Sequence, residues 1–147
     1  MKVAIACDHG GFELKKEIIS LLKELNLEFK DFGSYDDLPV DYADYGFKVA
    51  EVVSSGEFDR GILICGTGIG ISIAANKVKG IRCALVHDVF SAKTTREHND
   101  SNVLAMGGRI IGSGLARHIV ETWLSYEFIG AYHTERINKI AQYEKML

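Results

Sequence analysis

Residues 62–75 read Ile-Leu-Ile-Cys-Gly-Thr-Gly-Ile-Gly-Ile-Ser-Ile-Ala-Ala, and this stretch decides the fold of the chain. The apolar run at its start predicts a buried parallel strand, the glycines predict a tight loop, and the apolar and small residues after them predict a helix. Glycines let a ligand approach the main chain, and the N–H groups of such a loop add to the positive end of the helix dipole. The stretch therefore predicts a binding site for a negatively charged group.

Cys65 stands at the junction of the predicted strand and loop. A cysteine at the end of an apolar strand is commonly a small core residue. A thiol at the N-terminus of a helix ionises more readily and can act as a base or nucleophile near neutral pH. Both interpretations are open for Cys65, and the glycine loop that follows it favours the second.

Outward from this stretch, short apolar runs alternate with amphipathic segments. We expect strands at 2–7, 27–32, 61–65, 82–86 and 103–106, and helices at about 12–25, 42–55, 69–77, 89–98 and 115–123, with one more helix from about 134. Parallel neighbours need helical crossovers, and these are right-handed. The pattern predicts one α/β domain, residues 1–147. Its fold is a three-layer Rossmann-like, five-stranded parallel sheet in flavodoxin-like order, with helices on both faces and an extra C-terminal helix.

The bulk composition excludes several classes of protein. A net charge of −3 and the lack of a basic stripe argue against a nucleic-acid partner. No apolar run reaches the roughly 18 residues that span a membrane, and no signal-peptide pattern is present, so we expect a cytoplasmic protein without membrane contact. The odd number of cysteines fits a reducing compartment, and the histidines lack the i, i+4 pairing of a metal-binding helix. We expect no bound metal.

Polar and glycine residues follow four of the predicted strands. They are Asp8 and His9, Cys65 to Gly70, His87 and Asp88, and Gly107 to Arg109. Because the carboxyl ends of parallel strands share one edge of the sheet, where ligands collect, we expect these residues to lie together. A thiol base, a nest of N–H donors, and His and Arg side chains without a cofactor motif predict proton transfer on a small phosphorylated metabolite.

Each of these signals is weak when it is taken alone. Asp8 is also a favoured helix cap, and the phosphate loop of ATP and GTP hydrolases is absent. The glycine spacing differs from that of the dinucleotide-binding fingerprint, which requires an acidic residue about 20 positions further on. Asp88 does follow Gly70 at a similar interval, so a nucleotide-binding module stays open.

Four further motifs are more specific in combination. They are Cys-Asp-His-Gly-Gly-Phe at 7–12, Ile-Cys-Gly-Thr-Gly-Ile-Gly-Ile-Ser-Ile-Ala-Ala-Asn-Lys at 64–77, Arg-Glu-His-Asn at 96–99, and Gly108-Arg109 with His133 and Arg136. Together they resemble type B ribose-5-phosphate isomerase over essentially the whole chain, within a wider family that includes galactose- and allose-6-phosphate isomerases. The resemblance implies a pentose phosphate pathway enzyme without metal or cofactor. It would interconvert ribose 5-phosphate and ribulose 5-phosphate through a cis-enediolate.

The resemblance also implies roles for individual residues. Cys65 would move the proton between C1 and C2 with the help of Thr67, Asp8 would position the sugar, and His98 with Tyr42 would open the furanose ring. The implied substrate-binding residues are His9, Tyr42, Gly66, Gly68, Ile69, Gly70, Asn99, Arg109, His133 and Arg136. The N–H groups of the glycine loop would hold the enediolate oxygen, and His9, Arg109 and Arg136 would bind the phosphate. A homodimer or tetramer is implied, with His98, Asn99 and Arg109 acting across an interface.

One departure from the family pattern concerns the phosphate. The family usually has Gly-Gly-Arg-His where this chain has Gly130-Ala131-Tyr132-His133. A phenol donates one hydrogen bond, whereas the planar guanidinium of arginine matches two phosphate oxygens. A six-carbon substrate, allose or galactose 6-phosphate, therefore stays open. The alternative from another class is a non-catalytic module that binds a phosphorylated ligand or a nucleotide.

Overall fold

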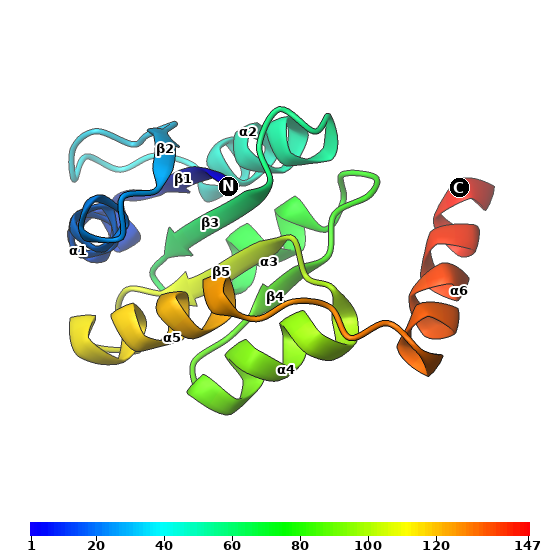
Figure 1. The fold of residues 1–147 in the computed structure, drawn as a ribbon. Coiled ribbons are helices and arrows are strands. Elements are labelled where there is room, and N and C mark those ends of the chain that lie inside the picture. Colours follow the sequence, from blue (N-terminus) through cyan, green and yellow to red (C-terminus); the bar gives the residue numbers. More distant parts are fainter.

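Five parallel strands form one sheet in the order β2-β1-β3-β5-β4 in the computed structural model, which describes all 147 residues (Figure 1). The strands are β1 (Lys2–Cys7), β2 (Glu28–Asp31), β3 (Arg60–Cys65), β4 (Cys83–Leu85) and β5 (Val103–Gly107). The helices are α1 (Phe12–Glu24), α2 (Tyr42–Ser54), α3 (Ile69–Ala75), α4 (Val89–Asn99), α5 (Ser113–Ser125) and α6 (Tyr132–Met146). The predicted five-stranded parallel α/β fold is confirmed.

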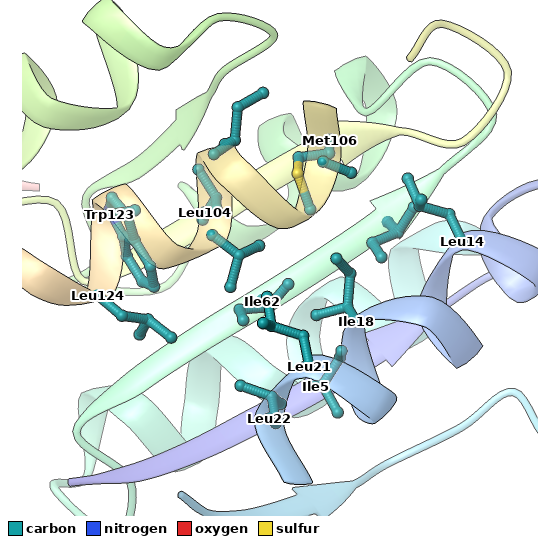
Figure 2. Close-up of a cluster of buried hydrophobic side chains, with 14 of the residues drawn as sticks. Ile5, Leu14, Ile18, Leu21, Leu22, Ile62, Leu104, Met106, Trp123 and Leu124 are labelled. Atoms are coloured by element: carbon teal, nitrogen blue, oxygen red, sulfur yellow. The ribbon is translucent and has the colours of Figure 1, made fainter. Parts of the chain in front are cut away.

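Alternate residues of the central strands point to opposite faces of the sheet and build two cores. Ile5, Ile62 and Leu104 pack against α1 and α5 on one face, where Trp123 is completely buried (Figure 2). The other core joins the sheet to α2 and α3, and it includes Cys65. The side chain of Cys65 therefore lies on the face covered by α2 and α3.

The predicted flavodoxin-like order is wrong at one edge of the sheet. In that order β4 lies beside β3. In this chain β5 pairs with β3 along its whole length, and β4 forms the edge. All residues of β5 are buried, whereas those of β4 are partly exposed and Leu85 is 40% exposed. A strand that is buried along its length belongs inside a parallel sheet, so β5 takes the inner position and the shorter, partly exposed β4 takes the edge.

Several helices and strands begin or end at residues other than those predicted. α3 ends at Ala75 rather than near residue 77, and β4 is shorter than the apolar run that predicts it. α5 and α6 begin earlier than expected, at Ser113 and Tyr132. The first turn of a helix lacks internal hydrogen-bond partners for its N–H groups, so its sequence signal is weak.

The C-terminal helix α6 lies beyond the amino ends of the strands, next to the end of α4 and to residues 80–82, which precede β4 (Figure 1). His133 is its only buried residue. Near the other end of the helix, the Glu144 carboxylate accepts hydrogen bonds from Gly80 N–H at 3.0 and 2.9 Å. None of the helices, α6 included, has both the length and the apolar character that crossing a membrane requires.

Candidate active site

Three loops meet at the carboxyl edge of the sheet, after β1, β3 and β5. The Asp8 N–H donates to the carbonyl of Ile64 at 3.1 Å, and the Gly108 N–H donates to the carbonyl of Cys65 at 2.8 Å. From β1 the chain continues to β2 on one side, while β3 lies on the other side, so the strand order reverses here. Ligands of open α/β sheets bind in the crevice at such a point.

Glycine is required where these loops touch. A Cβ atom on Gly10 would lie 2.8 Å from the backbone nitrogen of Gly66. Gly68, which precedes α3, has a φ of 77°, and a Cβ atom there would lie 2.7 Å from the carbonyl carbon of Met106. The left-handed conformation and the close contact both disfavour a side chain at Gly68. The surrounding loops therefore hold the glycine loop in one shape.

The Cys65 side chain lies at the base of this loop, with 3% of its surface exposed. Its Sγ atom accepts a hydrogen bond from the Gly68 N–H at 3.1 Å. The Ile69 N–H is also used inside the loop, because it donates to Thr67 Oγ1 at 3.2 Å. The backbone of the loop thus fixes the position of the sulfur atom.

Other N–H groups of the loop are free to bind a ligand. Those of Gly66, Thr67 and Gly70 donate no hydrogen bond within the chain. Thr67 is exposed, and the two glycines are half-buried. Unpartnered N–H groups at the start of a helix favour a negatively charged ligand. The expected anion site therefore rests on these N–H groups, since those of Gly68 and Ile69 are occupied.

Asp8, Tyr42 and Arg109 surround the glycine loop. One oxygen of Asp8, Oδ1, accepts two backbone N–H hydrogen bonds at 2.8 and 3.2 Å. The Tyr42 ring lies against Gly70, where a Cβ atom would be 2.6 Å from the ring, and Arg109 Nη1 would be 3.2 Å from a Cβ atom on Gly66. Arg109 therefore lies beside the loop of its own chain, whereas the resemblance implied action across an interface.

The His9 ring is oriented by the segment before α2. Its Nδ1 atom accepts a hydrogen bond from the Val40 N–H at 3.2 Å. A ring nitrogen that accepts a hydrogen bond carries no proton, so in the neutral ring the proton is on Nε2. His9 thus has an N–H donor available at the carboxyl edge of the sheet.

A second group of predicted site residues lies toward the amino ends of the strands, opposite the end that carries Cys65. His98 and Asn99 end α4, which begins beyond the carboxyl end of β4 and runs back toward the amino end of β5 (Figure 1). At 1.5 Å per residue, His98 lies about 14 Å along the helix from its first residue. The rings of His98 and His133 are stacked with centroids 4.2 Å apart, and Arg136 follows on α6. A single chain therefore keeps this group apart from Cys65.

His87 has a positioning contact that the sequence analysis missed. Its Nε2 atom accepts a hydrogen bond from the Gly107 N–H at 2.9 Å. Burial lowers the pKa of His87, and the Asp88 carboxylate opposes that shift. A Cβ atom on Gly107 would lie 2.8 Å from the backbone of Thr67, so the neutral His87 ring supports the strand that backs the glycine loop. The sequence signal for it is a histidine directly after an apolar strand.

The cavities of the chain do not include Cys65. The largest has a volume of about 300 Å³ and is lined by residues of β4, α4 and α6, among them Cys83 and Asn99. Burial raises the pKa of Cys83 to about 12. The His, Cys, Asp and Glu side chains form no group of three or more that could hold a metal ion. In the single chain the buried Cys65 side chain thus lines no cavity.

Sequence comparison finds relatives along almost the whole chain. Residues 3–140 match the family described as Ribose/Galactose Isomerase. Ribose-5-phosphate isomerase B of Escherichia coli (strain K12) is 47% identical, over 98% of this chain and 97% of that protein.

Solved structures of similar proteins have the same fold. Ribose-5-phosphate isomerase B of Clostridium thermocellum superposes with a TM-score of 0.98 at 55% identity, covering 99% of both chains. Ribose-5-phosphate isomerase B from Mycoplasma genitalium with bound ribulose 5-phosphate gives a TM-score of 0.95 at 42% identity, covering 99% of this chain and 97% of that one. On the family match and these identities, the chain belongs to the Ribose/Galactose Isomerase family.

Proposed function

We propose that the chain is an aldose–ketose isomerase that interconverts ribose 5-phosphate and ribulose 5-phosphate through a cis-enediolate, without a metal, and with Cys65 as the base. The observation that carries this proposal is a fixed thiol beside free N–H donors. The sulfur is bound by the Gly68 N–H, while those of Gly66, Thr67 and Gly70 are unused. Family membership supports isomerisation of a sugar phosphate, and the ribulose 5-phosphate bound by the Mycoplasma genitalium relative supports a five-carbon substrate.

The reaction needs a base for a carbon-bound proton and donors for the oxygen that becomes negative. Preorganised donors at such an oxygen are worth about 3–4 kcal/mol each. A positioned base contributes a further factor of roughly 10² to 10⁴. Cys65 acts as the base that takes the proton from one of C1 and C2 and returns it to the other, while the hydroxyl proton passes between O1 and O2 of the enediolate, with Thr67 assisting. The free N–H groups of the loop stabilise the enediolate oxygen.

The other polar residues bind and open the sugar. Asp8 uses Oδ1 for the backbone and has Oδ2 left for a sugar hydroxyl. His98 and Tyr42 open the furanose ring, and Asn99 binds the enediolate or its hydroxyl groups. The phosphate is bound by His9, Arg109 and Arg136, and His133 is a further substrate-binding residue.

The proposal includes a homodimer in which each site combines residues of two chains. His98 lies about 14 Å along α4 from the sheet edge that carries Cys65, whereas a hydrogen bond reaches only about 3 Å. A second copy would supply its own His98, Asn99, His133 and Arg136. Apolar side chains near the glycine loop are exposed in the single chain, and such patches mark association surfaces. They are Ile69, Ile73, Leu85 and Phe90.

A six-carbon sugar phosphate is the second candidate substrate, and Tyr132 is the observation that favours it. With tyrosine in place of the usual arginine, the phosphate site has one cation fewer, and a substrate held more by its hydroxyl groups would suit it.

Steady-state rates with ribose 5-phosphate, allose 6-phosphate and galactose 6-phosphate test these alternatives. We expect the highest kcat/KM with ribose 5-phosphate, unchanged after dialysis against EDTA. A higher kcat/KM with a hexose phosphate than with ribose 5-phosphate would show that the six-carbon sugar is the preferred substrate. Failure of all three sugars to exchange the C2 proton with deuterated water would leave only a binding module.

A further inference from the structure

Four side chains form a continuous stack where α6 meets the end of α4. The Arg136 guanidinium carbon lies 4.9 Å from the centroid of the Tyr132 ring. The Tyr132 and His133 rings are 4.2 Å apart and tilted by 37°, and the His133 and His98 rings are 4.2 Å apart and nearly parallel, at 14°. Tyr132 thus touches both the cation on one side of the group and the imidazole pair on the other.

The contacts of Tyr132 involve its ring rather than its hydroxyl group. The hydroxyl makes no hydrogen bond within the chain, and the side chain is 61% exposed. The covered member of the stack is His133, the one buried residue of α6. Tyr132 therefore contributes an apolar and polarisable surface that covers His133.

The charge of this group explains why an aromatic ring suits the position. Tyr132 and Arg136 are separated by one helical turn, where side chains are neighbours. A second arginine at that spacing would repel Arg136, whereas an aromatic face attracts a guanidinium. The ring thus holds Arg136 in place at a site that would otherwise bring two like charges together.

We propose that Tyr132 is a positioning residue, whose ring fixes Arg136 and, through His133, the imidazole of His98. This proposal rests on the function proposed above, in which Arg136 binds the phosphate and His98 opens the sugar ring. In place of a second phosphate-binding cation, the chain has an aromatic ring that orders the remaining groups. The rival explanation is that the Tyr132 hydroxyl binds the phosphate directly.

Two substitutions separate the ring from the hydroxyl. Tyr132→Phe keeps the stack and removes the hydroxyl, whereas Tyr132→Leu removes both. An exposed cation–aromatic contact corresponds to about a two- to fivefold change in an equilibrium constant. We expect KM for ribose 5-phosphate to rise by about that factor in Tyr132→Leu, and to stay within about twofold of the parent in Tyr132→Phe. Tyr143→Leu is the matched control, because Tyr143 is on the same helix and 63% exposed but is not part of the stack.

A second readout does not depend on activity. Burial lowers the pKa of His133, and the neighbouring His98 and Arg136 lower it further. Around this ring lie His98 from α4 and Tyr132 and Arg136 from α6. Proton NMR titration of the histidine rings should show the pKa of His133 rising toward its ordinary value in Tyr132→Leu. In Tyr132→Phe and in the Tyr143→Leu control it should stay low.

The outcomes decide between the two explanations. A Tyr132→Phe protein with the raised KM of Tyr132→Leu would overturn the proposal in favour of a direct hydroxyl contact. An unchanged His133 titration in Tyr132→Leu would show that the ring does not order the stack. If the parent protein isomerises no sugar phosphate, the proposed function fails, and the titration alone still decides whether Tyr132 positions these groups.

Discussion

Two inactive variants, Cys65→Ala and His98→Asn, should restore isomerase activity when they are combined in one dimer. Cys65 ends β3 at the carboxyl edge of the sheet, and His98 lies in the last turn of α4. That helix carries His98 about 14 Å along its axis away from this edge, and the proposed function therefore assigns the two side chains of one site to different chains. In the proposed dimer, each site takes Cys65 from one chain and His98 from the other.

The expected activity follows from how the chains pair. Random reassortment of equal amounts makes half of the dimers mixed, and each mixed dimer has one intact site and one site with both substitutions. The mixture should therefore reach about one quarter of the parent activity per chain, because a twofold dimer has two equivalent sites. Both variants must first be shown to fold, by their thermal unfolding temperatures.

The assay is conversion of ribose 5-phosphate after the two variants are unfolded together and refolded. Each variant treated alone is the control for residual activity. A mixture no more active than the average of its two components would refute the shared site. That result is expected if Cys65 and His98 act in the same chain, because every site would then lack one of them.

Further predictions concern stability. Gly68→Ala should lower the free energy of unfolding by at least about 1–2 kcal/mol, because φ is 77° at this position, and it should also reduce activity. The control is Gly114→Ala, because a Cβ atom on Gly114 would have no other atom within 4 Å, and this variant should be as stable as the parent or slightly more stable. Chemical denaturation measures both free energies of unfolding. The pKa of His87 is lowered in the folded protein. The neutral His87 ring therefore makes its full contribution to stability above pH 6.5, the ordinary pKa of histidine, and this contribution is lost as the pH falls. Protonation of the ring breaks the hydrogen bond that Nε2 accepts from the Gly107 N–H. In His87→Gln, the free energy of unfolding should depend less steeply on pH, and the remaining dependence should come from His133, whose pKa is also lowered. A slope of stability against pH equal to that of the parent would contradict the role assigned to His87.

The fold could be predicted from the sequence because its signals are local. Apolar runs alternate with amphipathic segments, and this alternation is enough to predict a parallel sheet with helical crossovers. The order of β4 and β5 could not be predicted in the same way. Both segments are short apolar runs, and their order depends on which one is buried along its length in the assembled sheet.

The local sequence pattern also does not predict which charged side chains are buried. Lys15 is 1% exposed, and its ammonium group contacts both oxygens of Asp31 at 2.7 and 2.9 Å. Arg96 is equally buried and pairs with Asp100 at 3.0 Å. A lysine or arginine on an amphipathic helix is expected to face solvent, and for Lys15 the partner comes from another element of the fold.

In the candidate site, too, features that are local in the sequence could be predicted and features that depend on packing could not. The glycine loop could be predicted because Cys65, Gly66 and Gly68 are consecutive or nearly so in the sequence. The sequence could not tell which N–H groups are free, because that depends on the Gly68 N–H turning toward the sulfur. Nor could it predict the stack of His98 on His133, which depends on how α6 packs against α4.

The most direct test of the central claim is the rate at which the C2 proton of ribose 5-phosphate exchanges with deuterated water. A folded Cys65→Ala protein should lose at least about a hundredfold in this rate relative to the parent, because it lacks the base. It should still bind the sugar phosphate through the free N–H groups and the cationic side chains. Exchange by the Cys65→Ala protein at close to the parent rate would show that another group removes the proton.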